Sequence, residues 1–179
     1  MRMLILDRDG VINEDSDAFI KSPEEWIPIA GSLEAVAAAN QKGYRVVVIS
    51  NQSGLARGLL DVATLNRIHA KMLREVARFG GRIEAIYFCP HGPNDACSCR
   101  KPLPGMLTDL AQRLDTDLCT ATLIGDRETD LAAGVAVGAT PVLVRTGHGE
   151  QTLSKLGHTS DIAVYDDLAA AVAGLERAA

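Results

Sequence analysis

The sequence is poor in aromatic residues and lacks an excess of positive charge. Aromatic residues make up 4% of the 179 residues and hydrophobic residues make up 47%, so we expect one domain, residues 1–179, with an aliphatic core. The net charge is −5 at pH 7. A chain with that charge has no basic stripe to neutralise the phosphates of nucleic acid or of a membrane surface. The composition excludes both partners and leaves room for a small anion that is bound locally.

Long hydrophobic runs are also absent. The first apolar run, residues 3–6, is too short for the core of a signal peptide, and no later run approaches the roughly 18 to 20 residues of a membrane span. We therefore expect a cytoplasmic protein, and we expect it to be a monomer. Of the four cysteines, three fall within residues 89–99, which favours a metal site over a disulfide framework. The fourth, Cys119, is expected to be an ordinary buried thiol.

Short β-branched runs alternate with helical patterns along the chain. The runs predict strands that are buried on both faces, at residues 3–6, 44–49, 83–88, 122–124, 141–144 and 162–165. Helices are predicted over 32–42 with Ser32 as its cap, over 61–79 with Asp61 as its cap, from Pro104-Gly105 onward, over 128–137, and over 167–176 with Asp166 as its cap. This alternation predicts a doubly wound α/β fold with a mainly parallel sheet.

Acidic residues follow the first and fourth of these runs. In open α/β sheets, ligands bind beyond the carboxyl ends of the strands. Alternate residues of an extended strand share a face, so Asp7 and Asp9 can point into one site while Arg8 turns away. Two carboxylates about 4 Å apart repel by roughly 4 kcal/mol at an effective dielectric of 20 and need a cation. Asp126 completes an oxygen-rich cluster that suits Mg²⁺.

Other groups at the strand ends suit a phosphoryl group. Ser50 offers a hydroxyl and Lys101 an ammonium group, so the pattern predicts phosphoryl transfer. A carboxylate such as Asp7 can attack phosphorus and form an aspartyl-phosphate. Asp9 would then protonate the leaving alkoxide and later take a proton from water. Lys101 and Mg²⁺ would offset the repulsion between the nucleophile and the phosphate.

These residues lie in four segments, DRDGVIN, SNQSG, RKP and GDRETD, which resemble the signature motifs of the haloacid dehalogenase (HAD) superfamily of phosphatases. The resemblance implies a Rossmann-like HAD core. It also implies Asp7 as nucleophile, Asp9 as general acid/base, Ser50 and Lys101 as phosphoryl binders, and Mg²⁺ on Asp7, the Asp9 backbone carbonyl and Asp126. Asp130 is left open as a residue that orients Lys101 or Ser50, a water-mediated metal contact, or a helix-terminus charge.

The loop at residues 89–99 has almost no apolar side chains, so hydrophobic burial cannot hold it in one shape. It supplies three thiolates and one imidazole, a set that suits a closed, structural, tetrahedral Zn²⁺ site. Such an ion would fix the segment that carries Arg100 and Lys101. The alternatives are a disulfide between Cys99 and either other cysteine, or free thiols. The predicted Zn²⁺ ligands are Cys89, His91, Cys97 and Cys99.

A zinc loop directly before RKP, without a large cap domain, resembles the HAD subgroup of heptose-bisphosphate and histidinol-phosphate phosphatases. The segments SGLARG, RKPLPGM and LVRTGHG resemble the heptose enzymes. The short spacing from His91 to Cys97 resembles the histidinol enzymes, and Arg127 stands where many heptose enzymes have lysine. The resemblance implies removal of the 7-phosphate of D-glycero-D-manno-heptose 1,7-bisphosphate, on the route to ADP- or GDP-heptose, with histidinol phosphate as the alternative substrate. It implies substrate contacts at Asp15, Ser16, Asp17, Ala18, Asn51, Gln52, Ser53, Arg100 and Arg127.

Two alternatives belong to other classes of protein. A phosphoacceptor signalling domain would carry its acceptor aspartate after the third strand, whereas here the third run leads into the zinc loop. A noncatalytic zinc-dependent scaffold is the second alternative. We expect His69, His148 and His158 to be ordinary surface or loop residues.

Overall fold

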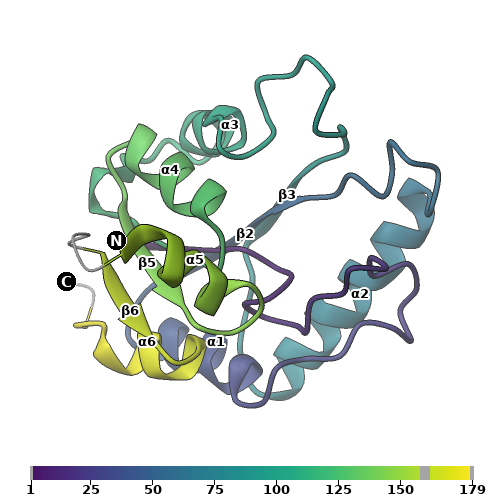
Figure 1. Cartoon of the computed structure of the whole chain (residues 1–179). Helices are drawn as coiled ribbons and strands as arrows, with labels where there is room; N and C mark the ends of the chain where they lie inside the picture. The colour runs from purple at the N-terminus through teal and green to yellow at the C-terminus, as the bar shows by residue number, and fades with distance from the viewer. Residues whose placement is uncertain (1, 158–161, 178–179) are drawn as a thin grey trace.

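The computed structural model describes residues 2–157 and 162–177 and contains a six-stranded sheet (Figure 1). The sheet order is β3-β2-β1-β4-β5-β6, and all neighbouring strands are parallel. The strands are β1 (Met3–Leu6), β2 (Arg45–Asn51), β3 (Ala85–Cys89), β4 (Thr122–Gly125), β5 (Thr140–Val144) and β6 (Ala163–Tyr165). The predicted α/β class and parallel sheet are confirmed, and the described ranges contain no large cap domain.

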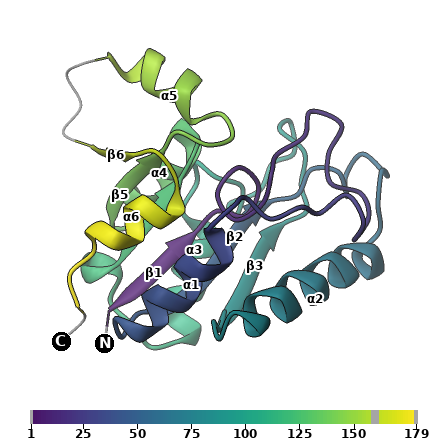
Figure 2. The same cartoon turned by 90° about the horizontal axis from the view of Figure 1, so that it is seen from below.

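The helices cover both faces of the sheet. They are α1 (Ser32–Gln41), α2 (Val62–Arg78), α3 (Gly105–Arg113), α4 (Glu128–Ala136), α5 (Gly149–Leu156) and α6 (Leu168–Gly174). Figures 1 and 2 show α1, α2 and α6 on one face and α3 and α4 on the other. Successive residues of β1 follow this division, because Leu4 and Leu6 belong to the core under α1, α2 and α6, and Met3 and Ile5 to the core under α3.

The strand order reverses next to β1. The chain adds β2 and β3 on one side of β1, and then places β4, β5 and β6 on the other. The register pairs Leu6 with Val48 of β2 and with Ile124 of β4. Residues that follow these strands therefore leave the sheet side by side, at the switch point where ligands bind in open α/β sheets.

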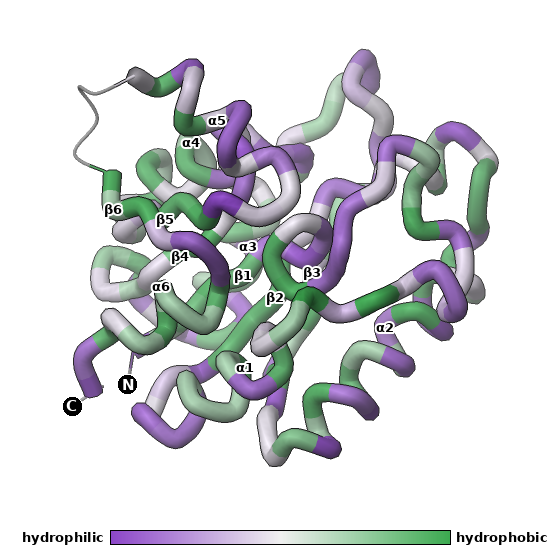
Figure 3. Tube along the Cα trace, turned by 60° about the horizontal axis from the view of Figure 1, so that its bottom comes forward, coloured by the Kyte–Doolittle hydropathy of each residue, from purple (hydrophilic) through white to green (hydrophobic). Residues whose placement is uncertain are grey.

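The hydropathy pattern explains α2. In Figure 3 this helix alternates between hydrophobic and hydrophilic segments, whereas the central strands are largely hydrophobic. Leu65, Ile68 and Met72 are fully buried on the inner face of α2, as their helical spacing predicts. Asp61 caps the helix as predicted, because its carboxylate accepts a hydrogen bond from the Thr64 N–H at 2.7 Å.

Two predicted caps are wrong. Ser32 lies inside α1, and its hydroxyl donates to the Ile12 carbonyl at 2.6 Å, while Gly31 is the N-cap with φ of 80°. For α6, the cap is Asp167 rather than Asp166, because the Asp167 carboxylate accepts from the Ala170 N–H at 2.8 Å. In α1 the serine hydroxyl therefore bonds to a distant loop instead of the helix end. In α6 the aspartate one position later than predicted caps the helix.

Two further features depart from expectation. The helix α5 was not predicted, because its eight residues begin at Gly149 and carry few apolar side chains. Cys119 is exposed rather than buried, because it lies on a short 3₁₀ helix, Leu118–Thr120, that leads into β4. No helix in the part of the chain that the structure describes has the length and apolar content to cross a bilayer.

Candidate active site

A cleft of about 740 Å³ lies at the carboxyl ends of the strands. Asp126 is fully buried beside it, whereas Ala18 is exposed and does not line it. Phe19 and Ile20, which the sequence analysis did not select, line the cleft instead. The cleft brings together most of the residues selected from the sequence, namely Asp7, Asp9, Asp15, Ser16, Asp17, Ser50, Asn51, Gln52, Ser53, Arg100, Lys101 and Arg127.

A buried lysine joins the acidic residues at the floor of the cleft. The Lys101 ammonium lies 2.9 Å from Asp7 Oδ1 and 2.5 Å from Asp130 Oδ1. It also donates to the Ile49 carbonyl at 3.3 Å. Asp130 Oδ2 accepts from the Arg127 N–H at 3.0 Å. Both oxygens of Asp130 therefore have partners, which supports its role as a residue that orients Lys101.

The acidic cluster carries more negative charge than Lys101 offsets. Burial, followed by the Asp130 charge, raises the pKa of Asp7 well above its usual value. Burial and the same charge raise the pKa of Asp126 to about 6. Lys101 is also buried, but Asp130 and Asp7 outweigh that effect and raise its pKa. A further cation at this point would favour the ionised forms of Asp7 and Asp126.

The donor set fits a small divalent cation. Asp7, Asp126 and Asp130 each offer an oxygen, and these oxygens lie within 4.8 Å of one another. Asp126 Oδ1 is buried without a hydrogen-bond partner among the described residues, whereas Asp126 Oδ2 accepts from the His148 N–H at 2.7 Å. Gly10, with φ of 82°, permits this arrangement because a Cβ there would overlap the Asp126 carboxylate.

Side chains of the segment after β2 hold other site residues in place. Asn51 accepts from the Lys101 N–H at 3.0 Å and donates to the Lys101 carbonyl at 3.1 Å. Gln52 donates to Ser50 Oγ at 2.7 Å and to Asp9 Oδ2 at 2.9 Å. Asn51 and Gln52 are predicted substrate contacts, and in the structure their amide groups hydrogen-bond to Lys101, Ser50 and Asp9.

Arg8 does not line the cleft, in agreement with the expectation that it turns away from the site, but its contact with Asp9 was not predicted. Arg8 is completely buried, and its guanidinium folds back to hold the Asp9 carboxylate, with Nη2 at 2.8 and 2.9 Å from the two oxygens. Burial opposes ionisation of Asp9, but the Arg8 charge and three side-chain hydrogen bonds outweigh it and lower the pKa. Asp9 therefore lies in a different electrostatic environment from Asp7.

Two histidines also contradict the expectation of ordinary surface or loop residues, and the third, His158, lies outside the described residues. His69 is buried, with Nε2 3.4 Å from Arg8 Nη1; its position four residues after Leu65, on the inner face of α2, was the signal that could have revealed it. His148 lies at the cleft, with Nε2 3.1 Å from Asp15 Oδ2. The same oxygen accepts from Arg127 Nη2 at 2.8 Å. No local pattern in the sequence indicates this contact across three loops.

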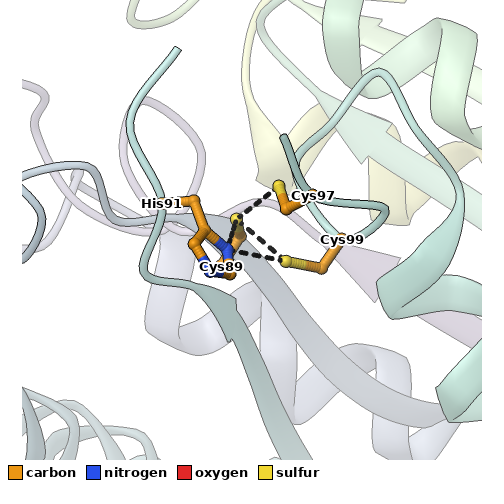
Figure 4. Close-up of side chains that lie close together, drawn as sticks. All are labelled: Cys89, His91, Cys97 and Cys99. Carbon is orange, nitrogen blue, oxygen red and sulfur yellow. Dashed lines mark hydrogen bonds between the residues drawn. The ribbon is translucent and has the colours of Figure 1, made fainter. Parts of the chain in front are cut away.

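The predicted zinc ligands converge in the loop after β3 (Figure 4). Cys89 Sγ lies 3.1 Å from Cys99 Sγ, 3.9 Å from Cys97 Sγ and 3.5 Å from His91 Nδ1. In a tetrahedral zinc site with Zn–S near 2.3 Å, ligand atoms are separated by roughly 3.5 to 3.8 Å. No disulfide joins these cysteines, so neither alternative disulfide is present. The ligand atoms of all four side chains lie within 4.8 Å of one another, as one bound metal ion requires.

The same loop is connected to the cleft by its last residues. Arg100 Nη1 donates to the His91 carbonyl at 3.1 Å, and Lys101 follows directly. Burial and the neighbouring Cys99 raise the pKa of the Cys89 thiol to about 12. A bound cation reverses such a shift, because thiolates are the form that ligates zinc.

The sheet order, the acids after β1 and β4 and the lysine after β3 define a HAD-like hydrolase. A family model described as HAD-hydrolase-like matches residues 98–171. The chain is 55% identical over 170 residues to the D-glycero-beta-D-manno-heptose-1,7-bisphosphate 7-phosphatase of Bordetella bronchiseptica, covering 95% of both chains. It is 52% identical over 170 residues to the enzyme of that name from Pseudomonas putida, covering 95% of this chain and 97% of the relative.

A solved structure agrees with these relatives. The D,D-heptose 1,7-bisphosphate phosphatase of B. bronchiseptica, complexed with magnesium and phosphate, matches with a TM-score of 0.93 and 53% identity, over 97% of each chain. The chain therefore belongs to the heptose-1,7-bisphosphate 7-phosphatase family of HAD-like hydrolases. Family membership confirms the predicted enzyme class, and the signalling and scaffold alternatives are wrong.

Proposed function

We propose that this protein removes the 7-phosphate of D-glycero-β-D-manno-heptose 1,7-bisphosphate, on the route to nucleotide-activated heptose. The names of its relatives support the substrate and the β anomer. The observation that carries the reaction is the convergence of Lys101 with Asp7 at 2.9 Å in a cleft that also contains Ser50. This convergence supports a site in which a carboxylate, an ammonium and a hydroxyl surround the transferring phosphoryl group.

In the proposed reaction, Asp7 attacks phosphorus and forms the aspartyl-phosphate. Lys101 and Ser50 bind the phosphoryl oxygens, and Asp130 keeps Lys101 in place through their contact. Asp9 protonates the departing sugar alkoxide and then takes a proton from the attacking water. The substrate-binding roles of residues 15–18 and 51–53, and of Arg100 and Arg127, remain predictions; all but Ala18 line the cleft.

Magnesium would be held by Asp7, Asp126 and the Asp9 backbone carbonyl. Support comes from the buried, unpartnered Asp126 Oδ1 and from the magnesium in the B. bronchiseptica structure. When bound, the ion neutralises charge at the transferring phosphoryl group. Zinc would be held by Cys89, His91, Cys97 and Cys99. Its role would be structural, because four protein ligands leave no open position.

We also propose that the protein acts as a monomer in the cytoplasm. A biosynthetic phosphatase acts where its phosphorylated substrates are made, which supports this location. Sedimentation of the purified protein checks the monomer, and a stable dimer would contradict it.

The substrate is tested by comparing kcat/KM for both anomers of the heptose bisphosphate and for histidinol phosphate. We expect the β anomer to be preferred, and a preference for histidinol phosphate would overturn the assignment. The nucleophile is tested with Asp7→Asn, which should lower kcat by at least about 10³-fold without unfolding the protein. Asp109→Asn is the matched control, because Asp109 forms an exposed ion pair with Arg113 on α3 and does not line the cleft.

A further inference from the structure

The mechanism leaves one buried charged side chain without a role. Arg8 lies between the two acids after β1, is completely buried and, with Trp26, is among the largest side chains without exposure. Burial of an arginine in an aliphatic core costs several kcal/mol unless its charge is paired and its donors are satisfied. A residue with only a packing role at this position would be aliphatic. The environment of Arg8 therefore requires an explanation in terms of Asp9.

Arg8 meets Asp9 through a planar fork. Nε lies 3.0 Å from Asp9 Oδ1, and Nη2 lies 2.8 Å from Oδ1 and 2.9 Å from Oδ2. Asn13 Nδ2 adds a donor at 2.9 Å to Oδ1, and Gln52 Nε2 adds one at 2.9 Å to Oδ2. Two-point contact of a guanidinium with a carboxylate fixes its plane as well as its position.

His69 completes the arrangement from the opposite side. Burial, and then the Arg8 charge, lowers the pKa of His69 to about 4, so the ring is neutral at pH 7. A guanidinium has only donors, so His69 Nε2 accepts from Arg8 Nη1 across 3.4 Å. The ring lies against Phe88, with centroids 6.1 Å apart. His69 therefore contacts Nη1 of the Arg8 guanidinium, while Asp9 contacts Nε and Nη2.

We propose that Arg8, held by His69, is a positioning residue that orients the Asp9 carboxylate for proton transfer in the cleft. The inference rests on the proposed role of Asp9 as general acid/base. It concerns the second half of the reaction most directly, because a carboxylate surrounded by N–H donors is in the form that accepts a proton. In that half, the oxygen of water bonds to phosphorus and its proton passes to Asp9. The bond between phosphorus and the Asp7 oxygen breaks, Asp7 regains its carboxylate, and inorganic phosphate leaves.

The experiment separates the two halves with p-nitrophenyl phosphate. Its leaving group departs as a stable anion and needs no proton donor, so formation of the aspartyl-phosphate does not depend on Asp9. Hydrolysis of the aspartyl-phosphate still depends on Asp9, which must take a proton from the attacking water. A mispositioned Asp9 therefore gives a burst of one equivalent of p-nitrophenol, followed by slow turnover. Intact-mass measurement after acid quenching detects the phosphorylated protein that accumulates.

The first variant is Arg8→Lys, which keeps the charge but loses the fork. We expect kcat to fall by roughly 10- to 100-fold, with a stoichiometric burst and accumulated phosphoenzyme. Arg45→Lys is the matched control, because Arg45 forms a fork with Glu84 at 2.7 and 2.6 Å at the opposite end of β2. It should turn over like the wild type. The inference is overturned if folded Arg8→Lys protein has the kcat of the wild type. It is also overturned if the kcat of Arg8→Lys falls but no phosphoenzyme accumulates.

A second pair of variants decides the question if Arg8→Lys does not fold. His69→Leu removes the acceptor for Arg8 and should show the burst, whereas His69→Gln keeps an acceptor and should restore turnover. Equal behaviour of these two variants overturns the inference. Asp9→Asn is the reference for the proposed function. If it fails to accumulate phosphoenzyme, the role of Asp9 is wrong; if it accumulates phosphoenzyme while the Arg8 and His69 variants do not, only the positioning role is wrong.

Discussion

The buried His69 predicts a loss of stability in weak acid that one substitution can isolate. Its pKa is about 4 in the folded protein and 6.5 for an ordinary histidine. The unfolded chain therefore binds a proton more readily than the folded one between these values. By linkage, stability is present above pH 6.5 and is lost as the pH falls toward 4. The full shift corresponds to about 3.4 kcal/mol, of which roughly 2 kcal/mol is lost between pH 7 and pH 5.

The assay is urea unfolding of the wild type and of His69→Gln at pH 7 and pH 5, in the same metal concentrations. Glutamine does not titrate, so the variant should lose about 2 kcal/mol less than the wild type over this interval. Other titrating groups contribute equally to both proteins and cancel in the difference. The reasoning is refuted if both proteins lose the same free energy of unfolding, since His69 would then titrate normally in the fold.

Three further outcomes follow from particular contacts. Asp130→Asn weakens the contact that orients Lys101 and should lower kcat by about tenfold or more at saturating magnesium; unchanged kcat would contradict this role. Lys42 donates to three carbonyls at the end of α6, at 2.6 to 2.9 Å. Lys42→Met should therefore cost about 1 to 2 kcal/mol in urea unfolding, with activity retained, and an unchanged midpoint would count against it. Cys97→Ser should lower bound zinc and speed hydrogen exchange around Arg100 and Lys101, whereas full zinc content with unchanged exchange would exclude a structural ion.

The sheet was predictable from the sequence because its strands are buried on both faces. Such strands read as unbroken aliphatic runs, and the run at 3–6 coincides with β1 (Met3–Leu6). The convergence of Asp7, Lys101 and Asp126 was predictable for a related reason, because parallel strands bring their carboxyl ends to one edge. The strands and the convergence of these residues depend on hydrophobic periodicity and on strand order, and both can be inferred from a single sequence.

The remaining site contacts depend on loop geometry, which has no periodicity. The contact of Asp15 with Arg127 and His148 joins three loops that are distant in the sequence. The contact of Arg8 with Asp9 was not predicted, because alternation along an extended strand ends with β1 at Leu6. Beyond that residue the backbone curls, and the Ile12 N–H donates to the Arg8 carbonyl at 2.8 Å. The alternation of side chains along β1 therefore does not predict where the long side chain of Arg8 lies.

The pair of carboxylates after β1 shows why one residue of separation suffices for two roles. Asp7 lies among Asp126, Asp130 and Lys101, and its pKa is raised by burial and by the other acids. Asp9 faces Arg8, and its pKa is lowered. Divergent environments for neighbouring titratable groups mark a division of chemical roles. A cation held by Asp7 and Asp126 would restore the charge of the nucleophile without affecting the Arg8 contact, so Asp7 can gain its reactive form on metal binding while Asp9 remains set to receive a proton.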